Sequence, residues 1–485
     1  MAIEASRTTL GAIRDRLGLG ELLGDPATPV SDVAIDSRLV RAGSLFCAVP
    51  GLVTDGRHFV ADAHAAGADA LLVESGPVES DLPQLVVPAG AGRRCAALAA
   101  CELLGDPSER TTVVGVTGTN GKTTVAHVLG HLLRVGGFEV RVIGTLTGAR
   151  TTPEAPELQR SLAELAGLAE AAGRAGAAVM EVSSHALVLE RVEGTAFALG
   201  LFTNLSRDHL DFHGTMEEYL AAKARLFAPE RCARGLFLAG DGAGEAIASG
   251  TTTPMEAVPR ASLEQLELKL GATSFTWRGH AVTTRFTGRF NADNLLLAAE
   301  GALRLGLSPE VVADGLSTCP PVPGRFEVVE GHPDQPVVVV DYAHTPAGVS
   351  GVLEAVAELL PARLAVVLGA GGGRDEGKRA EMARAALQHA DVVVVTADNP
   401  RHEDPADIAA QMLDGVSQAE RDAKVILELD RGRAIANAIE AAGPSGVVAV
   451  LGKGHETYQE VGDERRPFDD RLVAAELLSL ARGER

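Results

Sequence analysis

The feature that most constrains the fold is a set of four short, valine-rich runs in the last third of the chain. Each run is followed at once by a polar or charged loop. They are "PVVVVDYAHTP" (336–346), "RLAVVLGAGGGRDEGKR" (363–379), "DVVVVTADNPR" (391–401) and "GVVAVLGKGHE" (446–456). Such short, continuously apolar runs are typical of strands buried on both faces of a parallel sheet. Because ligands bind at the carboxyl ends of such strands, the four loops predict one site.

The same alternation of apolar runs with alanine-rich helical stretches extends over nearly the whole chain. It predicts an α/β protein with mostly parallel sheets. A length of 485 residues exceeds one ordinary core. A helical stretch that ends at Gly105, with Pro107 just beyond it, indicates a first boundary, and the cluster "CPPVPG" (319–324) indicates a second. We therefore expect three domains, at 1–107, 108–325 and 326–485.

Composition narrows the classes of partner. Acidic residues outnumber basic ones by 65 to 44, and the formal net charge of -21 argues against nucleic acid or an anionic membrane surface as the main partner. Anionic small ligands would have to meet local positive groups. The cysteines have no metal-ligand spacing and indicate free thiols in a reducing compartment. They are Cys47, Cys95, Cys101, Cys232 and Cys319. The N-terminal stretch lacks an apolar signal core, so we expect a cytoplasmic protein without membrane insertion.

The stretch "VVGVTGTNGKTT" (113–124) has the order of strand, glycine-rich loop and helix that a phosphate-binding loop needs. Its glycines let backbone N–H groups converge on phosphate oxygens, and the helix N-terminus adds partial positive charge. Lys122 would bridge the terminal phosphates of ATP, and Thr123 would ligate Mg²⁺. The expected ATP-binding residues of this loop are Gly118, Thr119, Asn120, Gly121, Lys122, Thr123 and Thr124.

Two later segments narrow the chemistry further. Glu181 ends the apolar run "AAVME", where a carboxylate could hold the metal. His209 lies in "NLSRDHLDFHG", and Lys223 follows in the helical stretch "EEYLAAKARLF". Considered alone, His209 would be interpreted as a residue that makes a hydrogen bond within its loop. Lys223 alone would be interpreted as a charged side chain that a helix exposes to solvent. Behind a phosphate loop, the three residues suggest one cluster.

These motifs together make the chain resemble a known family over essentially its whole length. In chain order, "GTNGKTT", "MEVSSHAL", "TNLSRDHLDFHG", "AAKARLF", "DYAHTP", "DNPR" and "GKGHE" resemble the motifs of the Mur ligase family. The resemblance implies an N-terminal uridine-binding α/β domain, a central ATPase-like parallel-sheet domain and a C-terminal Rossmann-like domain. It also implies that ATP phosphorylates a carboxylate and that an amine then displaces the phosphate, with Mg²⁺ neutralising the charge that develops.

Within the family, the chain is most similar to the branch that adds the third amino acid to UDP-N-acetylmuramoyl-L-Ala-D-Glu. By this resemblance, Lys122, Glu181, His209 and Lys223 form the catalytic set. Thr123 and Glu181 would hold one Mg²⁺, and His209 and Lys223 would serve a second. An ammonium cannot ligate a metal, so Lys223 would act as its carbamate. Asn294, Arg325 and Asp341 would complete the ATP site. The acceptor would contact Ser37, Thr54, Thr151, Thr152, Ser183 and Arg191.

The loop "DNPR" addresses which amino acid is added. In the resembling enzymes, an arginine at the position of Arg401 accompanies use of meso-diaminopimelate, whose distal carboxylate it can bind bidentately. A site built to pair that charge rejects an analogue that lacks it. The expected contacts are Arg374, Asp398, Asn399, Pro400, Arg401, Gly452 and Glu456.

The chain departs from the family pattern at two places, and several alternative functions remain open. The segment "IGTLTGARTTPEAP" (143–156) is shorter than in many relatives, and Leu189 stands where many have a polar residue. The same ligation with L-lysine, or a folylpolyglutamate synthetase-like reaction, is the nearest alternative. A P-loop regulatory or motor ATPase would need neither Lys223 nor the third domain, and a pure binding module fits least. We expect a monomer whose third domain closes over the phosphate loop during turnover.

Overall fold

The computed structural model describes residues 7–51, 54–329, 331–332, 334–358 and 361–480. The chain forms two compact units, one of residues 1–118, 129–202 and 221–257 and one of residues 119–128, 203–220 and 258–485. The expectation about an N-terminal signal concerns in part residues 1–6, which lie outside the described residues. Within the described ranges, no helix combines the length and apolar character that a membrane span requires.

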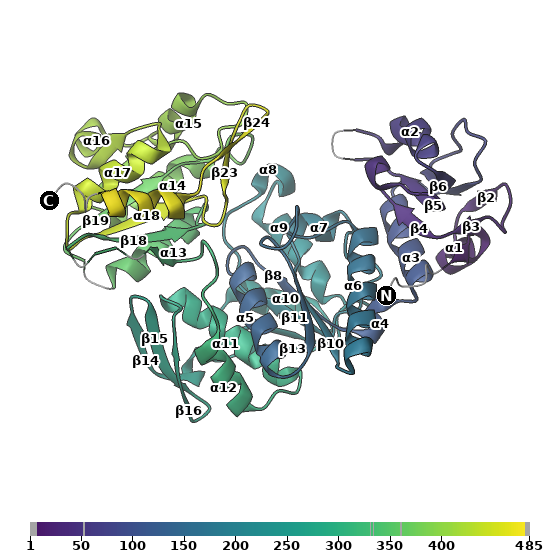
Figure 1. The fold of residues 1–485 in the computed structure, drawn as a ribbon, viewed down its shortest axis with the longest axis horizontal. Helices are drawn as coiled ribbons and strands as arrows, with labels where there is room; N and C mark the ends of the chain where they lie inside the picture. The colour runs from purple at the N-terminus through teal and green to yellow at the C-terminus, as the bar shows by residue number, and fades with distance from the viewer. Residues whose placement is uncertain (1–6, 52–53, 330, 333, 359–360, 481–485) are drawn as a thin grey trace. The chain divides into compact units, whose positions relative to one another are not determined.

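The N-terminal part of the first unit is a five-stranded sheet covered on both faces (Figure 1). Its order is β2 (Glu21–Leu23), β7 (Gln84–Val87), β6 (Ala68–Glu74), β5 (Ser44–Ala48) and β4 (Asp32–Ala34). Side chains alternate between the faces, so Leu45 and Cys47 pack under α1 (Leu10–Leu17) and α3 (Gly92–Leu104). Phe46 packs under α2 (Val60–Ala65) on the opposite face.

The second sheet of the first unit has six strands with the phosphate-loop strand near its middle. Its order is β13 (Met255–Val258), β12 (Gly235–Leu238), β11 (Leu199–Phe202), β8 (Thr112–Thr117), β10 (Gly176–Glu181) and β9 (Glu139–Ile143). The strand β8 pairs in parallel with both β10 and β11, and Glu181 lies opposite Val116. The loop that follows β8 therefore begins between the carboxyl ends of two neighbours, as the apolar runs predicted.

An antiparallel sheet within the second unit was not foreseen from the sequence. It consists of β14 (Leu263–Lys269), β15 (Ala272–Trp277) and β16 (His280–Thr284). Burial alternates along β15 and β16, and Trp277 is fully buried, with its indole N–H 3.2 Å from Glu300 Oε1. The alternation is typical of strands with one covered face, whereas the sequence analysis searched for continuously apolar runs. The chain continues into α11 (Arg289–Arg304) and α12 (Pro309–Thr318).

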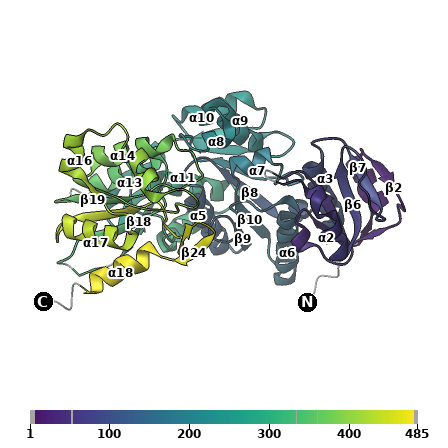
Figure 2. The ribbon, with the colours of Figure 1, turned by 90° about the horizontal axis from the view of Figure 1, so that it is seen from above.

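The four valine-rich runs form adjacent strands of one sheet, as predicted. The order is β17 (Glu327–Val329), β18 (Val337–Asp341), β22 (Val447–Leu451), β19 (Leu364–Leu368), β20 (Val392–Val395) and β21 (Val425–Leu427), and β17 is antiparallel to β18. One face is covered by α13 (Pro346–Ala357) and α14 (Lys378–His389), the other by α17 (Arg431–Ala442) and α18 (Asp470–Leu480) (Figure 2). This two-sided cover explains why the runs are continuously apolar.

Candidate active site

The phosphate loop joins β8 to α5 (Lys122–Val135). Gly121 adopts a φ of 84°, in the left-handed region, and a Cβ there would run into the side-chain oxygen of Asn294. Glycine is therefore required both by the backbone and by the close approach of α11. Lys122 Nζ donates to the carbonyl of Thr119 at 2.8 Å, which curls the lysine over the loop at the helix N-terminus. This is a cradle for an anion, as the motif predicted.

Neutral side chains that the sequence analysis did not single out hold this loop in place. The Asn204 side chain accepts from the backbone N–H of Asn120 at 3.0 Å and donates to its carbonyl at 3.1 Å. Thr203 donates to the same carbonyl at 2.6 Å, and the hydroxyls of Thr119 and Tyr219 lie 3.3 Å apart. The signal that could have found them is "TNLS", which directly follows the next strand of the sheet, β11.

The second unit also brings residues from distant parts of the chain to this loop. Arg325 Nη2 donates to Thr123 Oγ1 at 3.1 Å, and its guanidinium lies 4.3 Å from the centre of the Tyr342 ring. Asp341 accepts from the backbone N–H groups of Phe326 and Ala343 at 2.7 and 2.6 Å. Burial raises the pKa of Asp341. Arg325 and Asn294 therefore lie against the phosphate loop, and the contacts of Arg325, Asn294 and Asp341 with nucleotide stay predictions.

A charged network surrounds Asp208, which directly precedes His209. Lys378 Nζ donates to Asp208 Oδ1 at 2.9 Å, while His209 Nε2 and His344 Nε2 lie 3.4 and 3.7 Å from Oδ2. Burial alone would raise the pKa of Asp208, but His344, His209 and Lys378 hold that pKa well below its usual range. The backbone of His209 is left-handed, with a φ of 56°. This conformation is uncommon for residues other than glycine, and it is often found at functional sites.

The expected metal ligands lie in different units, so their joint site stays a prediction. Glu181 is buried at the end of β10, and its carboxylate accepts from the N–H of Thr145 at 2.8 Å and from its hydroxyl at 3.2 Å. Lys223 in α9 (Met216–Ala224) is 1% exposed, and Nζ donates to the carbonyl of Gly118 at 2.7 Å. Among the described residues, no group of three or more histidine, cysteine and acidic side chains could hold a metal ion.

The expected acceptor residues of the central block gather within the first unit. Thr152 Oγ1 accepts from the N–H of Ser183 at 3.1 Å, and Thr151 Oγ1 lies 3.1 Å from Thr145 Oγ1. Arg191 Nη1 donates to the Thr152 carbonyl at 3.4 Å. Ser37 begins a single turn after β4, and Thr54 accepts from the N–H of Gly51. These contacts leave every assigned acceptor role a prediction.

At the C-terminal sheet, the loops after β19, β20 and β22 meet as predicted. A Cβ on Gly371 would lie 3.1 Å from Arg401 Nη1 and 3.8 Å from Arg374 Cγ, so the two arginines flank one backbone position. A Cβ on Gly452 would run into Asp398 Oδ2. Because glycine lies where these side chains converge, the loops can approach each other closely.

The charges of these loops are paired within the chain, in one case with a residue, Glu460, that the motifs did not indicate. Arg401 Nε donates to Glu460 Oε2 at 2.9 Å, from a backbone with φ of 52°. The buried Lys453 Nζ lies 3.1 Å from both Asn399 Oδ1 and Glu456 Oε2. Glu460 belongs to β23 (Tyr458–Val461), which forms a hairpin with β24 (Glu464–Pro467). The hairpin places a carboxylate where the resemblance expects a ligand carboxylate.

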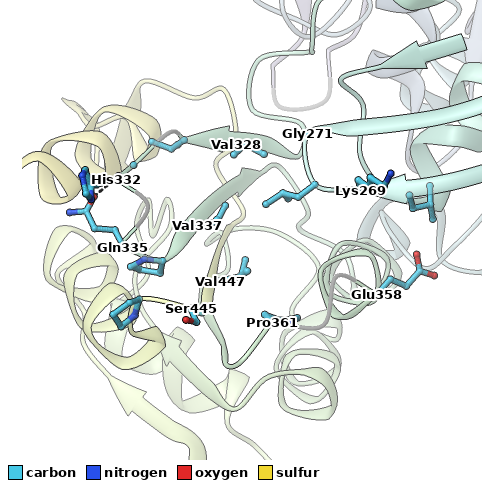
Figure 3. A pocket seen from close by; sticks show the side chains of 17 residues that line it. Lys269, Gly271, Val328, His332, Gln335, Val337, Glu358, Pro361, Ser445 and Val447 are labelled. Carbon is cyan, nitrogen blue, oxygen red and sulfur yellow. Dashed lines mark hydrogen bonds between the residues drawn. The ribbon is translucent and has the colours of Figure 1, made fainter.

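A hollow of about 800 Å³ lies elsewhere in the second unit, between the β14–β15 turn and the amino ends of β18 and β22 (Figure 3). Val337 and Val447, the first residues of those strands, line it. Its polar neighbours His332 and Gln335 bond to each other, with the His332 N–H 2.9 Å from Gln335 Oε1. Ligands of open α/β sheets bind at the carboxyl ends, so this hollow is not the reaction site.

Comparison with protein families gives three matches, one in each expected block. The model described as the Mur ligase family catalytic domain matches residues 29–95, the Mur ligase middle domain 116–302, and the Mur ligase glutamate ligase domain 324–454. The predicted three-domain α/β fold is confirmed by these matches, while the boundaries at 107 and 325 stay predictions.

Curated relatives match over nearly their whole length. The UDP-N-acetylmuramoyl-L-alanyl-D-glutamate–2,6-diaminopimelate ligase of Aquifex aeolicus is 40% identical over 469 residues, which cover 93% of this chain and 94% of that protein. The protein of the same name from Streptomyces coelicolor is 38% identical over 509 residues, covering 99% and 98%.

Solved structures agree in fold. A structure of a UDP-N-acetylmuramoyl-L-alanyl-D-glutamate–2,6-diaminopimelate ligase matches with a TM-score of 0.64 and 29% identity, covering 98% of this chain and 100% of that one. MurF ligase from Thermotoga maritima in complex with ADP matches with a TM-score of 0.61 and 22% identity, covering 93% and 96%, which supports the fold alone.

Proposed function

This chain belongs to the Mur ligase family, and we propose that it is the ATP-dependent ligase that adds meso-2,6-diaminopimelate to UDP-N-acetylmuramoyl-L-Ala-D-Glu in peptidoglycan precursor synthesis. The observation that carries the proposal is the contact of Arg325 with Thr123, which sets an arginine from the far end of the central block, 202 residues along the chain, on the phosphate loop. An isolated ATPase motif would not need that contact. We place the reaction in the cytoplasm, with small molecules as partners, no nucleic acid and a monomeric enzyme.

The reaction joins an acid and an amine by way of an acyl phosphate. The γ-carboxylate of D-Glu attacks the terminal phosphorus of ATP, and ADP leaves. The amine of diaminopimelate then attacks the acyl carbon, and inorganic phosphate leaves as the amide forms. A free carboxylate would have to expel oxide, which is a far poorer leaving group than phosphate. Lys122 and Arg325 would neutralise the phosphoryl oxygens during the first step.

The donor set fits ATP and Mg²⁺. The cradle formed by Gly118 to Thr124 at the start of α5 suits a polyphosphate, and the hydroxyl of Thr123 and the buried carboxylate of Glu181 are oxygen ligands that Mg²⁺ prefers. When bound, Mg²⁺ would neutralise charge on the phosphates and the incoming carboxylate. Thr123 and Glu181 belong to different units, so each is proposed as a ligand on its own chemistry.

Lys223 is proposed to act as its carbamate. A buried ammonium is costly, and the lysine is almost fully enclosed beside Gly118. Addition of CO₂ to the neutral amine with loss of a proton gives an anionic oxygen ligand. Bicarbonate should therefore restore activity to wild-type enzyme stripped of CO₂ at low pH, and it should have no effect on K223A. Restoration of K223A by bicarbonate would contradict this assignment.

Diaminopimelate is favoured over L-lysine because Arg374 and Arg401 flank Gly371 at the meeting point of the loops. The distal carboxylate of diaminopimelate would take the place that Glu460 occupies beside Arg401. The distal ammonium would meet Glu456 and the carbonyl of Gly452. L-Lysine lacks this distal carboxylate, so Arg401 would keep its internal partner Glu460 and gain no contact with the ligand.

Phosphate release from ATP is the direct test, measured with Mg²⁺ and UDP-N-acetylmuramoyl-L-Ala-D-Glu. We expect release and amide product with meso-diaminopimelate and neither with L-lysine or without an amino acid. Equal rates with L-lysine would retain the ligase and remove the specificity. Release that is independent of both acceptor and amino acid would identify a regulatory ATPase instead, and activity with folate and glutamate would identify a folylpolyglutamate synthetase-like enzyme.

A further inference from the structure

Three arginines converge on one carboxylate in the first unit. Glu154 directly precedes α6 (Ala155–Ala172), and its side chain is 12% exposed. Arg93 Nη1 lies 3.0 Å from its Oε2, Arg150 Nη1 lies 2.9 Å from Oε1, and Arg191 Nε lies 3.0 Å from Oε1. One carboxylate cannot neutralise three guanidinium groups. These four side chains by themselves therefore carry two positive charges in excess, and the carboxylates of Asp36 and Glu157 also lie within the electrostatic reach of Arg150.

Each arginine reaches the cluster from a different part of the expected acceptor site. Arg93 is on α3 and also donates to the carbonyl of Pro50 at 3.3 Å, and Pro50 pairs with Asp55 across the turn that holds Thr54. The cluster thus adjoins the loop that holds Thr54, and the resemblance implies that this loop binds one end of the acceptor.

Arg150 joins the other two acceptor segments. It directly precedes Thr151 in the shortened segment, and its charge reaches Asp36, the residue before Ser37. The pKa of Asp36 is lowered mainly by its hydrogen bond with Arg38, and Arg150 adds a smaller lowering of the same sign. Arg150 is thus adjacent in sequence to the threonine pair, and its charge acts on the turn that holds Ser37.

We propose that Arg93 and Arg150 bind the diphosphate of the nucleotide-sugar acceptor. The proposal rests on the proposed function, which supplies the acceptor. A nucleotide sugar has its base at one end, its sugar at the other and two negatively charged phosphates between them. The two arginines adjoin the segments expected to hold those ends, and guanidinium groups match phosphate oxygens bidentately. Glu154 holds the forks in position, and Arg191 is left for the sugar–peptide end.

A purely structural role would not need this excess of charge. Arg160 on α6 already links the two sheets of the unit, with Nη1 2.5 Å from Asp32 Oδ1 and 3.0 Å from the carbonyl of Val33. Arg160 is matched there by two carboxylates, since its Nη2 also lies 3.5 Å from Glu157 Oε1. In contrast, Glu154 is shared among three cations, and Arg150 remains 53% exposed at the side chain. Positive charge that is half-exposed and only partly neutralised by carboxylates is what a phosphate site requires.

The test compares the affinities of UDP and uridine for the full-length protein by calorimetry. A lost charge-assisted hydrogen bond corresponds to about tenfold in affinity. We expect R150Q and R93Q each to weaken UDP about tenfold while uridine changes less than about twofold, and R150K to recover most of the loss. Equal weakening of both ligands, or no weakening of UDP, would overturn the proposal.

Kinetics and a matched control separate this inference from the proposed function. In R150Q, KM for the acceptor should rise about tenfold with kcat nearly unchanged. The control is R141Q, because Arg141 pairs with Ser161 and Glu164 on the same helix but away from the cluster. R141Q should behave as wild type, and a loss of UDP binding there would overturn the assignment. If wild type fails to release phosphate with acceptor, the proposed function fails, whatever the UDP-to-uridine ratio.

Discussion

The phosphate loop (118–124) and the amino-acid loops (398–401 and 452–456) are both tips of parallel sheets, but different forces hold them. Neutral groups fix the phosphate loop, chiefly the side chains of Asn204 and Thr203 against the backbone of Asn120. Ion pairs fix the amino-acid loops, among them Arg401 with Glu460 and Lys453 with Glu456. The first arrangement uses no ion pair, although Lys122 and Lys223 also donate to backbone carbonyls of the loop.

The difference indicates how each site meets its ligand. A backbone cradle held by amides and hydroxyls can take a polyphosphate without first breaking an ion pair, so its geometry is set in advance. The arginine of the amino-acid loops must exchange an internal carboxylate for one on the ligand. Such an exchange gains affinity only for a ligand that brings the right charge, which makes it a device for specificity.

The largest effect is expected from K122M, which tests the phosphate loop alone. Loss of the ammonium removes a preorganised charge at the transferring phosphoryl group, and such losses cost roughly 10²–10³ in kcat. Phosphate release should fall by that factor with any amino acid present. K269M is the control, since Lys269 is 70% exposed and pairs with Glu267 on β14. Turnover in K122M within about tenfold of wild type would contradict the assigned role.

Beneath the amino-acid loops, a fully buried pair should dominate stability. Arg431 and Asp470 are both 0% exposed, and Arg431 also donates to the carbonyls of Leu451 and Ala397, which precede the two loops. R431M leaves the carboxylate buried and unpaired, which costs about 3–5 kcal/mol in the free energy of unfolding. Urea unfolding of the full chain measures this loss, and diaminopimelate binding should weaken more than ATP binding.

The exposed pair of Arg466 and Glu464 provides the matched control for R431M, with side chains 62% and 71% exposed. R466M should cost less than about 1 kcal/mol. R431M combined with D470L should recover much of the lost stability, because no charge is then left buried without a partner. If R431M and R466M cost the same, the buried pair does not support the loops.

Sequence analysis found both sites because their central features are local. A valine run that is buried on both faces predicts its own strand, and "GTNGKTT" predicts its own turn. The partners could not be found in this way. Asn204 lies far along the chain from Asn120, Lys378 farther still from Asp208, and Glu460 sits on a hairpin that no motif marks. Contacts at such separations depend on strand order, which a single sequence does not display.

The charge exchange at the amino-acid loops is tested by R401Q. KM for meso-diaminopimelate should rise about 10–100-fold, because a charge-assisted bidentate contact is lost, while ATP affinity should not change. Arg465 provides the control, because it pairs with the other oxygen of the same Glu460 at 3.0 Å and is 66% exposed. R465Q should leave KM within about threefold. If R465Q and R401Q raise KM equally, Arg401 has no special part in recognition.

The smallest effect concerns His455, which belongs to the amino-acid loop 452–456 and packs against Tyr342. Its ring centre is 5.2 Å from that of Tyr342, which also packs against His344 and the guanidinium of Arg325. Burial, and then the charges of Arg325, Arg471 and Lys453, lower the pKa of His455 to about 4 from 6.5. The unfolded chain therefore binds more protons than the folded one between these values, and stability is complete above the upper pKa and declines as pH falls toward the lower.

H455Q removes this titration, so it should lose less stability than wild type when the pH is lowered. The full shift would correspond to more than 3 kcal/mol, but solvent reaches part of the ring, and a difference of about 1 kcal/mol between about pH 7 and pH 5 is expected. Urea unfolding of both proteins at the two pH values measures it. An identical decline in wild type and H455Q would mean that the imidazole is not kept neutral by its neighbours. The contact that Tyr342 makes between the phosphate loop and the amino-acid loops would then not depend on the protonation of His455.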